Sequence, residues 1–389
     1  MKVLVLYSRD IDIDDSGGSR TTIELMNYLA NKGVICYSNF MIIKGGDKRI
    51  IMRPELKLNH KLLNDLILKE KIDILLIPEG YCLTEIGYNA CLNTACKIIS
   101  ALHSKPGYEK QRLWVEILES AKYNDSKLKK IRALLALILY PAVNYYYIRD
   151  FRKKMSKAYE YSNKLVLLSE NFYSTFIANY NIKDNGKKLT AIGNPLSFDS
   201  FFNINDIKLK KKQILVVARF DERAKRISLI LKTWELLQDL YLDWSLEIVG
   251  FGRSLPRYLK MEKKLGLKRI TFHGKQNPYI YYKEASIFLM TSSYEGWGMT
   301  ITEAQQQGCV PVVMNTFESL SEIITDGVNG FCVEDNNLEQ FVNRITQLIN
   351  DDILRVNMAA KSVELSGRFS KDIILKKYYD LFVNLINEE

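Results

Sequence analysis

The chain has 389 residues, of which 47% are hydrophobic and 26% charged. This composition is typical of a globular protein and excludes a disordered chain. The length is greater than one ordinary core organises, so we expect two domains of similar size. The net charge of +10 indicates an anionic partner, but no nucleic-acid-binding motif is visible, so we expect no nucleic acid among the partners.

The cysteines and histidines indicate neither disulfide bonds nor a metal site. The six cysteines form no C-x-x-C pair and several lie in apolar runs, as core residues of a protein in a reducing compartment do. The three histidines form no cluster with them. The apolar run Val3–Tyr7 is too short for a signal peptide and is soon broken by Arg9 and Asp10. We therefore expect a cytoplasmic protein whose fold begins at residue 1.

Strand-like and helix-like segments alternate along the first half, which favours a doubly wound α/β sheet. The expected elements are the strand 3–7, the helix 19–32, the strand 34–42, the helix 61–69 and the strands 72–77 and 96–102. A more open stretch rich in Phe, Asn and Asp follows Gly193, Asn194 and Pro195. We expect a domain boundary near residue 200.

The segment 127–154 combines an apolar run with basic flanks. The run 133–148 is interrupted by Pro141 and Asn144 and is short for a membrane-spanning helix. The basic residues around it are Lys127, Lys129, Lys130, Arg132, Arg149, Arg152, Lys153 and Lys154. Such a segment suits an element that lies on an anionic membrane surface, and it equally suits a core helix with solvated ends.

A second set of alternating elements begins after the boundary. The expected elements are the strand 213–218, the helix 227–240, the strands 245–249, 270–272, 287–290 and 331–333, and the helices 338–350, 352–365 and 370–386. The pattern therefore predicts an N-terminal domain of residues 1–200, a C-terminal domain of residues 201–370 and a final helix in residues 371–389.

Two glutamates, Glu295 and Glu303, are separated by seven residues near the end of the apolar run 287–290. The residues that follow the first glutamate are Gly296, Trp297, Gly298, Met299 and Thr300. The backbone N–H groups of the last three would begin a helix and point at a diphosphate, as helix N-termini do for anions. Glu295, at a strand end, can face a sugar. Glu303, about one turn into the helix, can accept both hydrogens of a ribose cis-diol.

This segment resembles the E-x7-E signature of retaining glycosyltransferases of the GT-B fold, in particular glycosyltransferase family 4. The strand 287–290 before it, and the helix end and strand within 307–313 after it, occur in the family's order. The resemblance implies two doubly wound Rossmann-like domains that face an interdomain cleft. It also implies that the N-terminal domain takes the acceptor, that the C-terminal domain binds the nucleotide-sugar, and that the last helix crosses back to the N-terminal domain.

Arg219 and Lys225 follow the strand 213–218 and resemble the two family cations that clamp the donor diphosphate. Two fixed cations stabilise the negative charge that grows on a leaving diphosphate, and arginine can bind two of its oxygens. The residue after the lysine is commonly glycine in the family, but here it is Arg226, which leaves open which cation makes the contact. A solvated basic loop is the alternative.

Two features of the first half resemble the opposite side of the family's site. Gly17 and Gly18 precede a helix and are similar to the Gly-Gly loop that approaches the donor phosphate and sugar, for which a residue without Cβ is suited. The alternative is a plain helix start with Ser19 as N-cap. His103 ends the strand 96–102, where doubly wound sheets bind ligands. It resembles the histidine beside the transferred sugar, unless it only satisfies local backbone groups.

The resemblance implies a metal-independent hexosyltransferase that moves a sugar, with retention, from a nucleotide-diphosphate donor to an acceptor. His103 and Glu295 would be catalytic, and a UDP-sugar would be the donor, with GDP-mannose second. The donor is a substrate, and no cofactor is implied. With the segment 127–154, the resemblance points to a saccharide or lipid-linked acceptor in surface polysaccharide biosynthesis at the inner membrane face. The alternatives are a sugar-nucleotide epimerase, a phosphorylase, or a non-catalytic membrane-associated subunit of the same fold.

Overall fold

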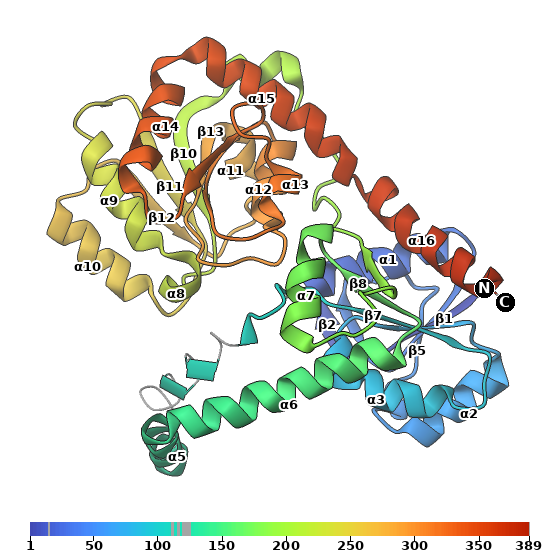
Figure 1. Cartoon of the computed structure of the whole chain (residues 1–389). Helices are drawn as coiled ribbons and strands as arrows, with labels where there is room; N and C mark the ends of the chain where they lie inside the picture. The colour runs from blue at the N-terminus through green and yellow to red at the C-terminus, as the bar shows by residue number, and fades with distance from the viewer. Residues whose placement is uncertain (15, 110–112, 115–116, 119–125, 389) are drawn as a thin grey trace. The chain divides into compact units, whose positions relative to one another are not determined.

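The structure is a computed structural model that describes residues 1–389 except 15, 110–112, 115–116, 119–125 and 389. The chain divides into two compact units (Figure 1). Unit 1 contains Met1–Gly193 and Leu375–Glu389, and unit 2 contains Asn194–Ile374. The chain therefore passes from unit 1 to unit 2 within the Gly-Asn-Pro turn. It returns to unit 1 inside the last helix, α16 (Lys371–Asn387).

Unit 1 is built on a parallel sheet of seven strands in the order β5-β3-β1-β6-β7-β8-β9. The strands are β1 (Lys2–Val5), β3 (Ile35–Ser38), β5 (Ile51–Met52), β6 (Ile74–Ile77), β7 (Lys97–Ala101), β8 (Lys164–Leu167) and β9 (Leu189–Ala191). A separate pair consists of β2 (Ile11–Asp12) and β4 (Ile42–Lys44). The chain first builds outward from β1 through β3 and then restarts at β6 on the other side, so the topological switch point lies between β1 and β6.

The helices of unit 1 connect these parallel strands. They are α1 (Gly17–Asn31), α2 (His60–Glu70), α3 (Gly80–Cys91), α5 (Lys127–Ile138), α6 (Tyr140–Tyr161) and α7 (Tyr173–Tyr180), with short 3-10 turns η1 (Pro54–Leu56) and η2 (Glu170–Phe172). The core packs strand residues such as Leu4, Leu75 and Ile98 against α2 residues such as Leu63 and Ile67. In α16, Tyr378, Phe382 and Leu385 are buried, and this part of the helix belongs to unit 1.

Unit 2 repeats the plan with six parallel strands in the order β12-β11-β10-β13-β14-β15. The strands are β10 (Lys211–Val217), β11 (Ser245–Val249), β12 (Ile270–Gly274), β13 (Ala285–Met290), β14 (Val310–Asn315) and β15 (Phe331–Glu334). The helices are α8 (Glu222–Lys225), α9 (Ile227–Leu237), α10 (Leu255–Leu265), α11 (Tyr279–Glu284), α12 (Met299–Gln306), α13 (Leu320–Ile323), α14 (Leu338–Asn350) and α15 (Asp352–Ser366), with η3 (Ile204–Leu209) and η4 (Gly367–Phe369). Its switch point lies between β10 and β13.

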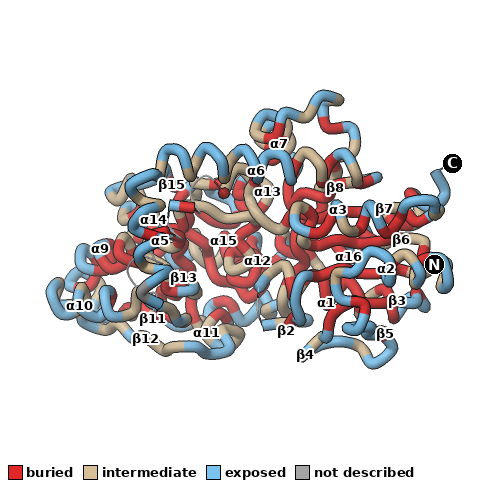
Figure 2. The backbone as a smooth tube through the Cα atoms, turned by 90° about the horizontal axis from the view of Figure 1, so that it is seen from below, coloured by how far each residue is buried: buried red, intermediate tan, exposed pale blue. Residues whose placement is uncertain are grey.

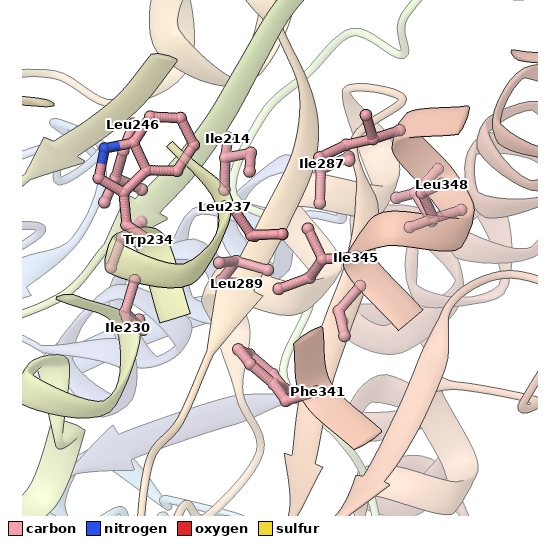
Figure 3. Packing of buried hydrophobic residues seen from close by; sticks show 14 of the residues in the cluster. Ile214, Ile230, Trp234, Leu237, Leu246, Ile287, Leu289, Phe341, Ile345 and Leu348 are labelled. Carbon is pink, nitrogen blue, oxygen red and sulfur yellow. The ribbon is translucent and has the colours of Figure 1, made fainter. Parts of the chain in front are cut away.

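A continuous apolar core holds the sheet of unit 2 in place (Figure 3). Trp234 and Leu237 of α9 and Phe341 and Ile345 of α14 pack with strand residues such as Leu289, and all are almost fully buried. Burial of each large apolar side chain stabilises the fold by about 1.5–3 kcal/mol. Burial follows the same pattern along the backbone: most strand residues are buried, and helices such as α10 have exposed outer turns (Figure 2). The predicted fold class, two doubly wound parallel α/β domains with a C-terminal crossing helix, is confirmed.

Candidate functional site

The carboxyl ends of β10 and β13 define the candidate site of unit 2. In doubly wound sheets ligands bind at the carboxyl ends of the strands, next to the switch point. The loop 218–226 follows β10, and the loop 291–298 follows β13. Because β10 and β13 are hydrogen-bonded neighbours, these two loops lie side by side although about 70 residues of chain separate them.

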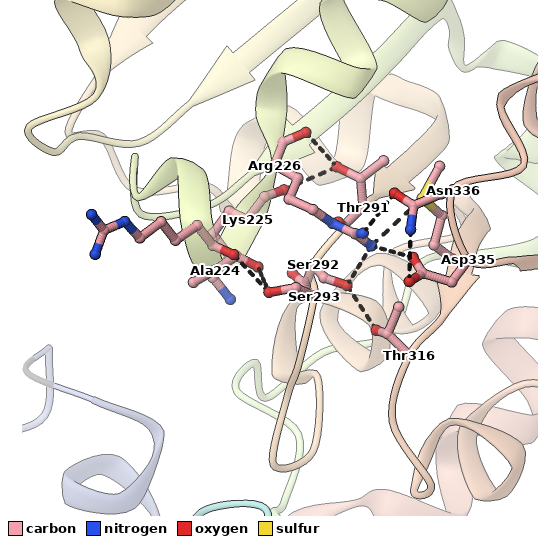
Figure 4. A network of polar contacts seen from close by, with 11 residues as sticks. Ala224, Lys225, Arg226, Thr291, Ser292, Ser293, Thr316, Asp335 and Asn336 are labelled. Atoms are coloured by element: carbon pink, nitrogen blue, oxygen red, sulfur yellow. Dashed lines mark hydrogen bonds and ion pairs between the residues drawn. The ribbon is translucent and has the colours of Figure 1, made fainter. Parts of the chain in front are cut away.

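Hydrogen bonds connect the two loops (Figure 4). The backbone N–H of Ser293 donates to the carbonyl of Ala224 at 2.8 Å, and the Thr291 hydroxyl donates to the carbonyl of Lys225 at 2.9 Å. The result is an ion pair between the Lys225 ammonium and the Glu295 carboxylate, whose side chains are 20% and 16% exposed. The structure therefore brings together two of the predicted site residues in a partly buried position.

The Arg226 side chain forms hydrogen bonds with the loop after β13 and with Asp335 (Figure 4). Its Nε donates to the Thr291 carbonyl at 2.6 Å, and its Nη2 donates to the Ser292 carbonyl at 3.2 Å and to Asp335 Oδ1 at 2.6 Å. Its backbone is left-handed, with φ 47°, a conformation that favours glycine. The guanidinium is thus occupied by these loops, and Lys225 is the cation that lies beside Glu295.

The two roles of Arg226 predict an unusual order of stability among its variants. Arg226→Ala removes the hydrogen bonds to buried carbonyls and keeps the left-handed strain, so we expect a loss of about 2–3 kcal/mol in the free energy of unfolding. Arg226→Gly also loses the bonds but relieves the strain, and should be about 1 kcal/mol more stable than the alanine variant. Urea unfolding of both variants measures the difference; equal stabilities would contradict the strain at this position.

Arg219 follows β10 and is exposed. The segment that carries Arg219 packs against Gly250 and Gly252, which lie in the turn after β11. A Cβ on Gly250 would lie 1.8 Å from the Ala218 carbonyl oxygen, and one on Gly252 would lie 2.5 Å from the Phe220 carbonyl oxygen. The backbone N–H of Phe220 also donates to the Phe251 carbonyl at 2.7 Å. The sequence indicated only a turn here; the structure shows a backbone contact that holds the segment carrying Arg219.

The turn between the two glutamates leads into α12 as the sequence predicted. Gly298 has φ 84°, and a Cβ there would meet the Ile301 side chain at 3.0 Å, so glycine is required. No described side chain caps the helix start at Met299 and Thr300, which leaves their N–H groups suited to an anion. Of the preceding residues, Gly296 accepts a hydrogen bond from the Ser319 hydroxyl at 3.0 Å. Trp297 is buried and packs edge-on against Phe369.

Glu303 lies deeper than Glu295, since it is only 5% exposed. The Ser197 hydroxyl donates to its Oε1 at 2.5 Å, and the Tyr282 hydroxyl donates to its Oε2 at 3.0 Å. These hydroxyls hold the carboxylate in one orientation. Neither Ser197 nor Tyr282 was predicted, because they belong to the stretch before η3 and to α11 and carry no local motif.

In unit 1 the structure brings Gly18 and His103 together. A Cβ on Gly18 would lie 3.3 Å from Cβ and Cγ of His103, so the absence of a side chain permits the close approach. Helix α1 begins at Gly17 and is capped by Ser16, whose hydroxyl accepts from the Ser19 N–H at 3.1 Å. Ser19 is therefore not the N-cap. Gly18 and His103 follow β1 and β7 in the chain. Because the sheet is parallel, the carboxyl ends of these two strands lie on the same side of it.

Glu79 is a further acidic residue at this edge. It follows β6, and its Oε2 accepts a hydrogen bond from the backbone N–H of Ser8, after β1, at 3.0 Å. The sequence signal was present, since Glu79 follows a buried strand after one proline, Pro78. The predicted site residues are thus distributed over both units: Gly17, Gly18 and His103 in unit 1, and Arg219, Lys225, Glu295, Glu303 and the 296–300 turn in unit 2.

The cysteines lie apart from this chemistry. All six are free, and burial raises the pKa of Cys36 and of Cys332 to about 12. These thiols are protonated near neutral pH and so are poor nucleophiles and metal ligands. In the described part of the chain, no group of three or more His, Cys, Asp or Glu residues is placed to hold a metal ion.

Two doubly wound units, each built on a parallel sheet and joined through a crossing helix, define the GT-B fold. Solved structures of this fold are similar to the chain. The chain is similar to Anabaena HepE in complex with UDP-glucose, with a TM-score of 0.70 and 15% identity over 99% of this chain and 100% of that one. It is also similar to Staphylococcus aureus TarM in complex with UDP, with a TM-score of 0.58 and 19% identity over 83% of this chain and 58% of that one. At these identities the similarity establishes the fold.

Residues 197–364, which make up most of unit 2, match the model of the family glycosyl transferases group 1. An uncharacterized glycosyltransferase of Haemophilus influenzae is 30% identical over 173 residues, which are 44% of this chain and 49% of the relative. The amylovoran biosynthesis glycosyltransferase AmsD of Erwinia amylovora is 27% identical over 236 residues, 59% of this chain and 65% of the relative. The chain thus spans about half to two thirds of the length of these relatives.

Proposed function

We propose that this chain is a glycosyltransferase that moves a sugar from a UDP-sugar to a saccharide acceptor. One observation carries the proposal: the Lys225–Glu295 ion pair lies at the carboxyl ends of β10 and β13, just before the helix start at Met299. A cation, a sugar-facing carboxylate and a helix N-terminus are what a sugar nucleoside diphosphate requires. All three lie within the family segment 197–364.

The proposed roles follow from these positions. The N–H groups at the start of α12, with Arg219 and Lys225, bind the diphosphate and stabilise the charge that grows on it as the glycosidic bond breaks, so no metal ion is needed. In the free protein Lys225 is paired with Glu295. The incoming diphosphate competes for the ammonium, which lets the carboxylate turn to the hydroxyls of the donor sugar. Glu303, oriented by the Ser197 and Tyr282 hydroxyls, binds the ribose.

Unit 1 supplies the acceptor side in this proposal. His103, packed on Gly18, contacts the transferred sugar, and Gly17 and Gly18 let backbone approach the donor. The acceptor attacks the face from which the diphosphate leaves, and a phosphate oxygen takes the acceptor proton, so the anomeric configuration is retained. The UDP complexes of HepE and TarM favour UDP over GDP as the nucleotide.

The acceptor belongs, by this proposal, to surface polysaccharide assembly on a lipid carrier at the cytoplasmic membrane face. Support for a polymer acceptor comes from two relatives, the amylovoran biosynthesis glycosyltransferase of Erwinia amylovora and the poly(ribitol-phosphate) alpha-N-acetylglucosaminyltransferase of Staphylococcus aureus. The lipid carrier and the membrane face rest on the basic and apolar segment 127–154. A screen of sugar nucleotides separates the alternatives by their products. A transferase slowly releases free sugar and UDP. An epimerase yields an isomeric sugar nucleotide, and a phosphorylase yields a sugar phosphate when inorganic phosphate is present.

UDP is expected to stabilise the protein against heat, and GDP is not. Ligand at about 100 times its Kd adds about 2.7 kcal/mol to the free energy of unfolding, which a thermal shift assay detects. Glu303→Gln, which keeps the size of the side chain, should weaken UDP binding about 10- to 100-fold because a charge-assisted hydrogen bond to the ribose is lost. No shift with either nucleotide would rule out the proposed donor class.

A further inference from the structure

Helices α5 and α6 extend from unit 1 beyond its sheet (Figure 1). The second half of α6 is anchored, since its buried residues are Met155, Ala158 and Tyr159. The first half of α6 and all of α5 lie beyond this anchor, and the chain bends by 94° between the two helices. Within the described residues, no single helix is long and apolar enough to cross a membrane, and only this bent pair has the combined length and composition.

Helix α5 has apolar residues on two sides. Ala133 packs in a small cluster with Leu113 and Ile117, to which parts of α5 and α6 such as Leu137 and Val143 add contacts. The outer face of α5 consists of Leu128, Ile131, Leu134, Leu135 and Ile138. These positions recur at helical spacing and so form one stripe. Their exposed fractions run from 52% for Leu134 to 76% for Ile138, so the alternative of an ordinary core helix does not hold for this face.

The charged residues of the segment that contains α5 are almost all basic. The segment 127–154 contains eight basic residues and one acidic residue, Asp150, and so carries seven of the ten net positive charges of the chain. Within the described part of α5, Lys129 and Arg132 are exposed, and Arg132 lies beside the apolar stripe by its position in the helical repeat. Tyr145 and Tyr146, also exposed, follow in α6. Exposed aliphatic residues with interspersed cations and flanking tyrosines match the interface of an anionic bilayer.

We propose that the outer face of α5 binds an anionic lipid surface, with α5 lying in the plane of the interface. A spanning arrangement would bring Lys129, Lys130 and Arg132 into the hydrocarbon, where charges are strongly disfavoured. In the plane of the interface, the same cations reach the phosphate groups while the leucines and isoleucines enter the acyl boundary. The inference complements the proposed lipid-linked acceptor, and the binding itself does not depend on catalysis.

Co-sedimentation of the full chain with vesicles tests the proposal. We expect binding to vesicles of phosphatidylcholine with phosphatidylglycerol, little binding to phosphatidylcholine alone, and release at high salt. Ile131→Gln with Leu135→Gln should lower the affinity about tenfold or more, and so should Lys129→Gln with Lys130→Gln. Leu68→Gln is the matched control, because Leu68 of α2 is 54% exposed and Leu135 is 53% exposed; it should bind as the unmodified chain does.

Several outcomes would overturn the proposal. They are no binding to anionic vesicles, equal loss in the Leu68 control, and retention in the membrane at high salt and alkaline pH, which would indicate insertion. A dimer in solution that the Ile131 and Leu135 changes dissociate would show that a second copy covers this face instead. Hydrolysis of the UDP-sugar without vesicles should be unchanged in these variants. Vesicle binding without hydrolysis would count against the proposed function alone, and hydrolysis without vesicle binding would count against this inference alone.

Discussion

Lys225→Ala is expected to lower kcat/KM for the UDP-sugar by about 100- to 1,000-fold, the loss typical when one group that stabilises transition-state charge is removed. The Glu295 carboxylate holds the ammonium, while the Thr291 hydroxyl and the Ser293 N–H hold the backbone of the loop by binding the carbonyls of Lys225 and Ala224. The position of the ammonium is therefore set before the donor binds, and Arg226 is not placed to substitute for it, because its guanidinium is bound to Thr291, Ser292 and Asp335. Release of UDP in the presence of the donor measures the loss.

Arg223→Ala is the matched control for this experiment. Arg223 lies in the same short helix, α8, and is exposed, so the variant removes one positive charge from the same loop without touching Glu295. We expect activity within about threefold of the unmodified chain, as for surface charges. If both variants lose activity equally, the loop acts through its overall charge. If Lys225→Ala keeps its activity, the diphosphate role of Lys225 is wrong.

Gly250→Ala is expected to destabilise the protein by about 3 kcal/mol or more. The new Cβ would lie 1.8 Å from the Ala218 carbonyl oxygen, a distance at which backbone must move. Overpacking of this kind costs about 1–3 kcal/mol, and the left-handed conformation at φ 148° adds about 1–2 kcal/mol for a residue with Cβ. Because the displaced segment carries Arg219, we also expect weaker UDP binding in the fraction that remains folded.

Gly266→Ala is a control that separates the cost of a left-handed backbone conformation from the cost of a steric clash. Gly266 caps α10 with φ 59°, and a Cβ there meets nothing within 4 Å. Only the conformational cost applies, so we expect a loss of about 1 kcal/mol and no change in UDP binding. Chemical unfolding of both variants gives the two values. Similar losses in the two variants would show that the contact between Gly250 and Ala218 relaxes at little cost.

The segment around Glu295 shows how much of the site could be predicted locally. The strand before it, the glycine turn and the helix after it are β13, Gly298 at φ 84° and α12. Each depends on neighbouring residues: an apolar run, a position without Cβ and a series of helix formers. The close approach of Gly18 to His103 was not predicted as a contact. The sequence proposed the two residues separately, Gly18 in a loop before a helix and His103 at a strand end, and parallel strands place the segments that follow them at the same end of a sheet.

Partners that are distant in the chain could not be predicted in this way. The sequence left open which of Lys225 and Arg226 makes the contact that the resemblance implies. In the structure, Arg226 binds Asp335, which is 109 residues away, and Lys225 pairs with Glu295. Ser197 reaches Glu303 across 106 residues. Such pairs arise from the order of strands in the sheet and from the exact path of each loop, and they leave no local pattern.

The sequence by itself determined the alternation of strands and helices, two doubly wound domains, and the position of Glu295 and Arg219 just after buried strands, because these follow from short-range periodicity and turn chemistry. Only the tertiary structure decided that Lys225 pairs with Glu295, that two hydroxyls orient Glu303, and that one side of α5 stays exposed. The physical reason is that pairing and burial depend on which distant segments the fold packs together, and a side chain that is apolar in sequence can lie on either side of a helix.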